Sequence, residues 1–277
     1  MCAEVEAQLR GQALGEDVEL VYLNAALRDD FSYNAMASRE EKLDAFDRFL
    51  ESVRSRYAPD FLYIACNTLS ILFDDPRFRR HDQVPTQGIV ETGTRSILAA
   101  LDASGPSPIV VFATPTTVSE GAYPSALVEA GVPAEQIVQQ ACPGLPDAIS
   151  NDHTGGEAQA LLERFVPAAL AGFRTAPRKL IAFLGCTHYG YQAERFRALL
   201  ADHCARPRIV DPNTAAAGDI LQWLGGRPGT GRLSVRFVSP YRVPEKPLAS
   251  LPRYLGDRAP ATVAALRGFE HDPRLYG

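Results

Sequence analysis

The feature that most constrains the fold is a repeated alternation of short apolar runs with segments of helical periodicity. The runs are rich in β-branched residues, and several are almost continuously apolar. They predict strands at 18–23, 61–65, 86–90, 109–113, 179–184, 208–210 and 233–238. Continuous apolar strands are typical of parallel sheets that helices cover on both faces. The alternation therefore predicts an α/β chain.

Between these strands, apolar residues recur at the spacing of an amphipathic helix. Ser38 and Glu41 form a capping box at the start of the clearest case. Its apolar stripe consists of Leu43, Phe46, Leu50, Val53 and Tyr57. Further helices are predicted at 93–103, 123–130, 155–170, 191–202 and 214–224, with a last one near 259–268. The proline-rich stretch 240–252 predicts an irregular excursion before that last helix.

The composition excludes several classes of function. The 277-residue chain is 46% hydrophobic and 22% charged, with a formal net charge of -5, and it has no basic run with interleaved aromatic residues. Nucleic acid and anionic membranes are therefore not expected partners. We expect no membrane span, because no apolar stretch is long enough. The first ten residues carry Glu4 and Glu6 and no apolar core, so we expect no secretory signal and a cytoplasmic location.

Five cysteines are scattered along the chain without a Cys-x-x-Cys pair. They are Cys2, Cys66, Cys142, Cys186 and Cys204. This spacing fits neither a zinc site nor a disulfide framework, so we expect free thiols and no metal. A single cysteine after an apolar run is more often a buried small residue than a reactive group. Cys2, Cys142 and Cys204 are interpreted as structural or surface thiols.

Cys66 and Cys186 differ from the others because each follows a predicted buried strand. The first strand continues into Cys-Asn-Thr at 66–68, and the second continues through Gly185 into Cys-Thr-His at 186–188. The strand at 109–113 ends in Thr-Pro-Thr-Thr. In α/β sheets, ligands bind at the carboxyl edge of the strands, and the N–H groups of a following helix favour an anion and lower the pKa of a thiol. The pattern predicts a polar pocket suited to a carboxylate.

Two like acid/base groups suit the inversion of a stereocentre. Inversion needs a base on one face of Cα and an acid on the other, and the two exchange roles in the reverse direction. A cysteine pair meets this need with one thiolate and one thiol, since a free cysteine titrates near the working pH. Asn and Thr side chains can hold the substrate's carboxylate and stabilise the charge that develops there. No dinucleotide loop and no lysine in a cofactor context is visible, so no cofactor is expected.

The segments Ala-Cys-Asn-Thr at 65–68 and Leu-Gly-Cys-Thr-His-Tyr at 184–189 resemble the paired signatures of the aspartate/glutamate racemase superfamily, and most closely those of glutamate racemases. The Thr-rich segment that leads to Tyr123, the Ala-Cys-Pro at 141–143 and the strand end at 209–211 are also similar to family segments. The resemblance implies two pseudosymmetric α/β lobes, each a mainly parallel sheet flanked by helices, with the active site between the lobes. Residues 1–90 and 206–277 would form the first lobe, and residues 91–205 the second.

The resemblance also implies roles for individual residues. Cys66 and Cys186 would be the bases on opposite faces of Cα, and His188 would assist Cys186. The residues that would bind the substrate's amino-acid portion are Asn67, Thr68, Thr114, Thr117 and Thr187. The implied activity is cofactor-independent glutamate racemisation (EC 5.1.1.3), which supplies a D-amino acid for peptidoglycan, and a homodimer is the implied assembly.

Three departures from the family pattern leave alternatives open. Family members begin with a strand that carries Asp-Ser-Gly, whereas here Met1 falls in the first predicted helix, so we expect the first lobe to lack that strand. The Glu that follows Ala-Cys-Pro in glutamate racemases has no counterpart in register, because Asp147 is the only acid there. Residues 31–34 replace the family's Pro-Tyr-Gly. The alternatives are a racemase or isomerase of another small acid (aspartate, maleate or hydantoin type) and a carboxylate-binding relative without turnover.

Overall fold

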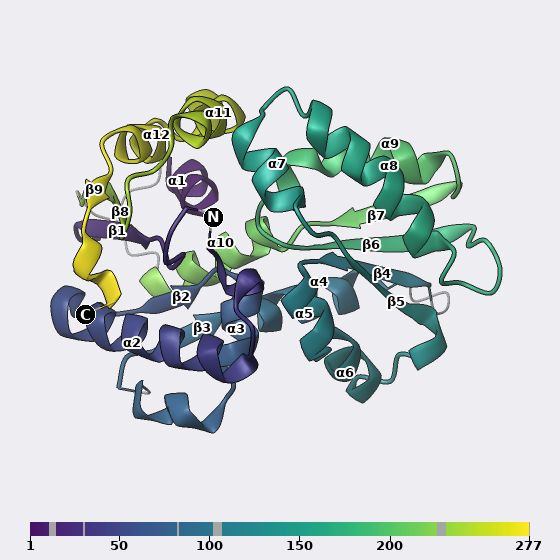
Figure 1. Ribbon diagram of the computed structural model, residues 1–277, viewed down its shortest axis with the longest axis horizontal. Coiled ribbons are helices and arrows are strands. Elements are labelled where there is room, and N and C mark those ends of the chain that lie inside the picture. The colour runs from purple at the N-terminus through teal and green to yellow at the C-terminus, as the bar shows by residue number, and fades with distance from the viewer. Residues whose placement is uncertain (11–14, 30, 82, 102–106, 226–230, 277) are drawn as a thin grey trace. The chain divides into compact units, whose positions relative to one another are not determined.

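A computed structural model describes residues 1–10, 15–29, 31–81, 83–101, 107–225 and 231–276. The chain divides into two compact units, which are described separately. Unit 1 comprises Met1–Ile64, Leu72–Gln87 and Ala216–Gly277, and unit 2 comprises Ala65–Ile71 and Gly88–Ala215. Both contain strands with flanking helices (Figure 1), and the predicted α/β class is confirmed.

The strands are β1 (Val18–Leu23), β2 (Leu62–Ile64), β3 (Thr86–Gly88), β4 (Ile109–Ala113), β5 (Ile137–Ala141), β6 (Lys179–Gly185), β7 (Arg206–Val210), β8 (Leu233–Ser239) and β9 (Glu270–His271). The helices are α1 (Cys2–Leu9), α2 (Arg39–Tyr57), α3 (Asn67–Phe73), α4 (Ile89–Ala100), α5 (Pro115–Glu120), α6 (Ala122–Glu129), α7 (Leu145–Asn151), α8 (Gly156–Leu170), α9 (Ala193–Ala201), α10 (Pro212–Leu224), α11 (Glu245–Leu255) and α12 (Pro260–Arg267).

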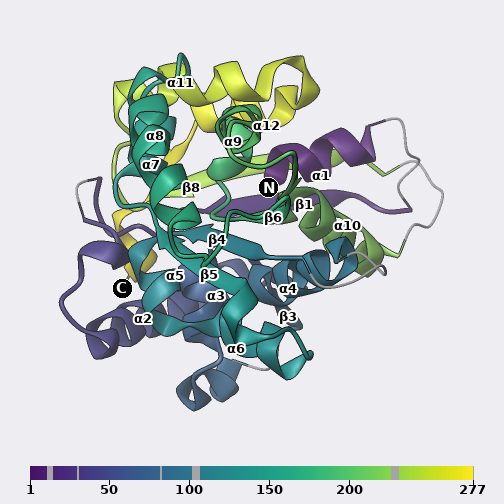
Figure 2. The same ribbon diagram turned by 90° about the vertical axis from the view of Figure 1, so that its right-hand side faces the viewer.

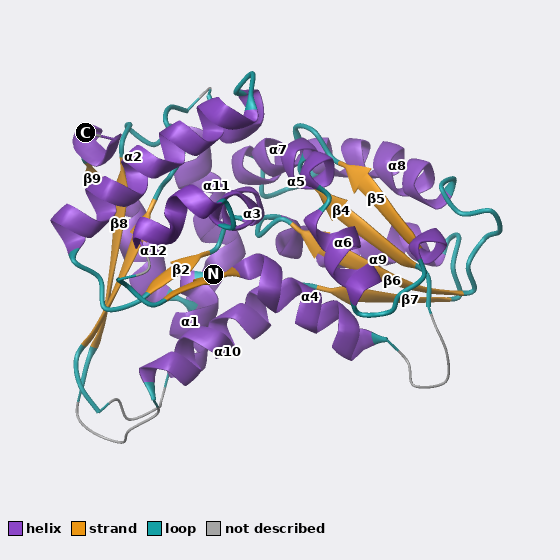
Figure 3. Ribbon diagram, turned by 90° about the horizontal axis from the view of Figure 1, so that it is seen from below, coloured by secondary structure: helices purple, strands orange, loops and turns teal. Residues whose placement is uncertain are grey.

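Unit 2 is built on a four-stranded parallel sheet with the strand order β5-β4-β6-β7. Helices α4 and α6 cover one face and α8 and α9 the other (Figures 1 and 3). Val111 and Phe183 pack on the first face with Tyr123 of α6. Phe112 points to the opposite face, where its ring lies 4.9 Å from that of Phe196 in α9. Burial on both faces explains why β4 reads as a continuous apolar run.

Unit 1 contains a three-stranded sheet with the order β1-β8-β9, in which the paired strands are parallel, and a two-stranded sheet of β2 and β3. Helix α1 lies beside α10 (Figure 2), and Val5 and Leu9 of α1 form a buried cluster with Ala217 and Ile220 of α10. Leu20, Leu233 and two aromatic residues of the 61–63 segment pack against this cluster. The first helix is therefore part of the core of unit 1.

A buried carboxylate fastens α1 to the start of α12. Glu6 is only 4% exposed. Its two oxygens accept hydrogen bonds from the backbone N–H groups of Ala261 and Thr262, at 2.8 and 2.7 Å, and from the Thr262 hydroxyl at 2.7 Å. The first N–H groups of a helix have no partner within the helix, and an acidic side chain both satisfies them and complements the helix dipole.

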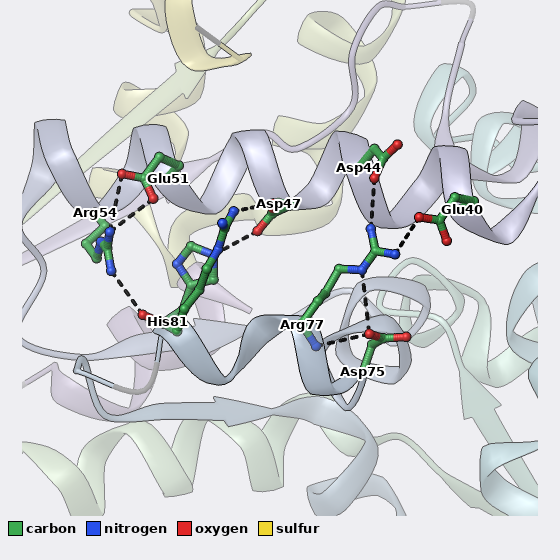
Figure 4. A network of polar contacts seen from close by, with 9 residues as sticks. Glu40, Asp44, Asp47, Glu51, Arg54, Asp75, Arg77 and His81 are labelled. Atoms are coloured by element: carbon green, nitrogen blue, oxygen red, sulfur yellow. Dashed lines mark hydrogen bonds and ion pairs between the residues drawn. The ribbon is translucent and has the colours of Figure 1, made fainter.

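Ion pairs connect α2 to the 3₁₀ segment Pro76–His81 (Figure 4). Arg77 binds two carboxylates of α2, and Arg80 and His81 share Asp47. Burial acts to raise the pKa of Asp47, but hydrogen bonds from His81 and Arg80 outweigh it and leave that pKa below its ordinary value. The pairs with exposed partners contribute about 0–1 kcal/mol each. The buried His81 ring therefore makes the most specific contact of the network.

Most of the predicted elements are confirmed. The capping box forms, because the Ser38 hydroxyl accepts a hydrogen bond from the N–H of Glu41 at 3.1 Å and the Glu41 carboxylate accepts one from Ala37 at 3.0 Å. The last residues of the helix predicted at 93–103 lie outside the described residues. The chain also contains β5, α3, α5 and α7, which were not predicted.

The prediction of an irregular excursion at 240–252 is wrong, because α11 occupies Glu245–Leu255. Pro247 falls in its first turn, where an N–H has no intrahelical partner, so proline is tolerated there. Pro252 falls in the last turn, where it removes one hydrogen bond near the end of the ladder.

The predicted lobe boundaries stay a prediction. In the structure, residues 65–71 pack with unit 2, although the preceding strand β2 belongs to unit 1. Among the described residues, no helix combines the length and the apolar character that crossing a bilayer requires.

Replacing Glu6 by Gln is expected to lower the free energy of unfolding by about 1–3 kcal/mol, because three charge-assisted hydrogen bonds to a buried group are weakened or lost. Urea denaturation measures the change. Glu4 makes a matched control, since its ion pair with Arg258 is on the surface, and Glu4→Gln should cost less than about 1 kcal/mol. Equal effects of the two substitutions would contradict the assignment.

Candidate active site

The predicted site residues all belong to unit 2 and follow three strand ends. Strands β4 and β6 are neighbours whose register pairs Ala113 with Gly185. Thr114 and Cys186 are therefore the first residues beyond a common sheet edge. A Cβ atom on Gly185 would lie 3.0 Å from the carbonyl oxygen of Phe112, so glycine allows the strands to stay close up to that edge.

Three threonine hydroxyls form a closed triangle. The Oγ1 atoms of Thr68 and Thr114 are 3.2 Å apart, those of Thr68 and Thr117 are 3.3 Å apart, and those of Thr114 and Thr117 are 3.1 Å apart. All three side chains are buried. The structure thus brings together a residue of α3 and two residues at the start of α5, Thr114 just before it and Thr117 within it, that lie almost fifty positions away in the sequence.

Cys66 is exposed and lies just before α3. Desolvation by surrounding protein raises the pKa of its thiol above the ordinary value of 9.0. The N–H groups of Leu69 and Thr68 and the Thr68 hydroxyl act in the opposite direction, because they stabilise a thiolate. The opening turn of α3 therefore offsets part of the cost of forming a negative charge on Cys66.

Cys186 is 9% exposed, and its Sγ lies 3.7 Å from Nδ1 of His188. Burial raises the pKa of this thiol to about 12, while the backbone N–H of His188 acts to lower it. The charges of Cys66, Asp147 and Asp211 raise it further. The two thiols are therefore coupled, since a thiolate at Cys66 disfavours a second one at Cys186.

Burial lowers the pKa of His188 to about 4. Its imidazole is uncharged at neutral pH, and it acts on Cys186 through a hydrogen bond rather than through a positive charge. Thr187, between them, has its carbonyl oxygen held by Nδ2 of Asn213 at 3.0 Å. Asn213 itself is fixed by Asp211, whose Oδ1 accepts from its backbone N–H at 3.0 Å. The 186–188 turn is therefore anchored to the segment after β7.

Asn67 lies at the start of α3 and is 4% exposed. Its Oδ1 accepts a hydrogen bond from the hydroxyl of Tyr123. Its Nδ2 is buried and finds no hydrogen-bond partner within the described chain. Buried amide hydrogens without a partner are unusual in a folded protein, and a bound acceptor group would satisfy them.

Sequence reasoning did not assign a role to Asp147, Asp211, Asn213 or Tyr123. Asp147 does not align with the family's Glu after Ala-Cys-Pro, yet its negative charge contributes to the raised pKa of Cys186. Asp211 and Asn213 follow a strand end, which is the one signal that could have singled them out. In the described ranges, no group of three or more His, Cys, Asp or Glu side chains is arranged to hold a metal ion.

The arrangement combines two coupled thiols, a neutral imidazole, a triangle of hydroxyls and an unpartnered amide donor. Such donors suit a carboxylate, and the thiols suit the transfer of a single proton at a time. The roles predicted for the individual residues stay predictions.

The chain is similar to known racemases in sequence and in fold. The family model described as Asp/Glu/Hydantoin racemase matches residues 1–220. A glutamate racemase of Limosilactobacillus fermentum is 29% identical over 163 residues, which cover 59% of this chain and 56% of that protein. The match thus spans little more than half the length of this curated relative.

Solved structures show a similar fold. A glutamate racemase isoform from Bacillus anthracis matches with a TM-score of 0.70 at 19% identity, covering 92% of this chain and 88% of that one. A glutamate racemase from Francisella tularensis in complex with D-glutamate matches with a TM-score of 0.69 at 18% identity, covering 92% and 89%.

Cys66 is expected to react with iodoacetamide faster than Cys186, because it is exposed and Cys186 is buried. The reactive form is the thiolate. The pKa of Cys66 is raised above 9.0, so the rate should increase about tenfold per pH unit between pH 7 and 8.5. Mass spectrometry of peptides that contain each cysteine measures both rates, with Cys66→Ser as the control. A rate that is already at its plateau at pH 7 would contradict the raised pKa.

Proposed function

The chain belongs to the Asp/Glu/hydantoin racemase family, and on that premise we propose that it is a cofactor-independent glutamate racemase with Cys66 and Cys186 as its two bases. The observation that carries this proposal is the placement of two cysteines within one unit, Cys186 directly after β6 and Cys66 two residues after β2. Threonine hydroxyls and an unpartnered amide donor lie in the adjoining turns.

The proposed reaction moves one proton at a time. The thiolate of one cysteine takes the α-proton, and the electron pair of the Cα–H bond passes to Cα and the α-carboxylate. The thiol of the other cysteine then donates its proton to the opposite face of Cα. The two cysteines have exchanged protonation states at the end, and the reverse reaction starts from that arrangement.

The protonation equilibria support this division of labour. Both thiols have a raised pKa, and negative charge on Cys66 raises that of Cys186 further. The resting site therefore favours two thiols, and the loss of one proton disfavours the loss of a second, so that one thiolate faces one thiol during turnover. The neutral His188 beside Cys186 would orient the thiol through its hydrogen bond without adding a charge to the site.

Glutamate is the proposed substrate because the matched relatives are named glutamate racemases. Asn67, Thr68, Thr114, Thr117 and Thr187 are the proposed ligands of its amino-acid portion. Developing negative charge on the α-carboxylate would be stabilised by the hydroxyl and amide donors. A cytoplasmic location and a homodimer remain parts of the proposal.

Incubation of the protein with one enantiomer of glutamate in heavy water should yield the other enantiomer with deuterium at Cα. Replacement of either Cys66 or Cys186 by Ala should abolish inversion, by at least about a thousandfold in kcat, because one face of Cα loses its acid or base. Circular dichroism follows inversion, and proton NMR follows exchange.

The single variants provide a sharper test. With one thiol left, a variant can still remove the α-proton from one enantiomer and return deuterium to the same face. Cys66→Ala and Cys186→Ala should therefore exchange opposite enantiomers without inverting them. Cys204→Ala is the control, because the Cys204 thiol donates to the backbone carbonyl oxygen of Arg178 and takes no part in the proposed site. Full inversion in either single variant would overturn the two-thiol mechanism, and turnover of aspartate, maleate or a hydantoin in place of glutamate would correct the substrate.

A further inference from the structure

Tyr123 is a buried phenol that the proposed proton transfers do not use. It lies in α6 and is 0% exposed. Its ring packs on Phe183 with the ring centroids 4.7 Å apart, and its hydroxyl donates to Oδ1 of Asn67. A single side chain thus links the core beneath β6 to the first residue of α3.

Asn67 needs this contact because an amide has two orientations of nearly equal shape. They differ by a half-turn of the amide, which exchanges a carbonyl oxygen with an NH₂ group. A donor aimed at Oδ1 distinguishes between them. Because Oδ1 accepts from Tyr123, the Nδ2 group points the other way. Both of its hydrogens stay available, since Nδ2 is buried and has no hydrogen-bond partner among the described residues.

Gly93 shows that the chain makes room for the phenol. It lies inside α4, where glycine is about 1 kcal/mol less favourable than alanine. A Cβ atom at this position would lie 2.7 Å from the Tyr123 hydroxyl oxygen and 2.7 Å from Cζ of Phe183. Gly93 is therefore unfavourable for the helix, but it leaves the space that the Tyr123 hydroxyl occupies.

We propose that Tyr123 is a positioning residue, which holds the Asn67 amide in the orientation that presents both Nδ2 hydrogens to the substrate's α-carboxylate. This inference rests on the proposed racemase function. In the opposite orientation, the carbonyl oxygen of Asn67 faces the carboxylate and repels it. The hydrogen bond that Oδ1 accepts also polarises the amide and strengthens donation from Nδ2.

The stabilisation that the oriented Asn67 amide gives to the carboxylate increases during the proposed reaction. As the α-proton leaves, negative charge builds up on the carboxylate, and a fixed donor stabilises the transition state more than the bound substrate. Loss of the phenol hydroxyl should therefore affect kcat more than KM. If Tyr123 had only a structural role, its loss would lower the stability of the protein without lowering kcat relative to KM.

Tyr123→Phe removes the hydroxyl and keeps the ring that packs on Phe183. We expect it to lower kcat about three- to tenfold with KM changed by less than about twofold. Asn67→Ala should lower kcat by about ten- to a hundredfold, and in that background Tyr123→Phe should have less than about a twofold further effect. Independent, additive effects of the two substitutions would overturn the proposal.

A second measurement works without turnover. The sequence contains five asparagines, so labelling with ¹⁵N-asparagine gives few side-chain amide signals, and Asn67→Ala assigns the relevant pair. Tyr123→Phe should shift or broaden that pair, and the control Ser52→Ala, which removes a hydroxyl bonded to Arg274 in unit 1, should not. Unchanged Asn67 amide signals in Tyr123→Phe would overturn the proposal. A wild-type protein without racemase activity would instead refute the proposed function, while the NMR comparison still decides whether Tyr123 fixes the amide.

Discussion

The parallel pairing of β4 with β6 is the constraint on which the candidate site depends. Ala113 and Gly185 face each other across that pair, so the turns that carry Thr114 and Cys186 start from the same edge. The close approach at Gly185 leaves no room for a side chain without displacement of β4. Because both faces of the sheet are covered, the strands are rigidly packed. The sheet, rather than the residues of the turns themselves, therefore fixes where Thr114 and Cys186 lie.

The electrostatics of the site follow from this packing. Desolvation by surrounding protein makes both thiols hard to ionise, and the nearby carboxylates add to the difficulty at Cys186. The compensating groups are mostly backbone N–H donors, which carry no net charge and cost no ordering when a thiolate forms. Uncharged donors therefore provide most of the stabilisation that a thiolate at either cysteine receives.

The sequence predicts β4 and β6 well because they are buried along almost their whole length and read as unbroken apolar runs. It does not reveal β5, whose Gln139 and Gln140 interrupt the pattern and whose residues are all half-buried. The short helices α5 and α7 are also missed. Each begins with a proline in its first turn and has six or seven residues, which is too short for helical periodicity to emerge. The two cysteines and the threonines are found because strand ends are visible in a sequence. Their second-layer partners Tyr123 and Asn213 are not, since a contact across more than twenty residues leaves no local pattern.

The triangle of threonine hydroxyls has a consequence for the ordering of protons. Each hydroxyl carries one hydrogen and can also accept, so a ring of three can close in a clockwise or an anticlockwise sense with every oxygen atom in place. A ring closed in either sense uses all three hydrogens within it, so a threonine that donates to an outside acceptor, such as Thr68 to the Cys66 thiolate, opens the ring. Rotation of one O–H bond is enough for that, because the oxygen atoms keep their places. The triangle can therefore release a donor without any movement of the backbone.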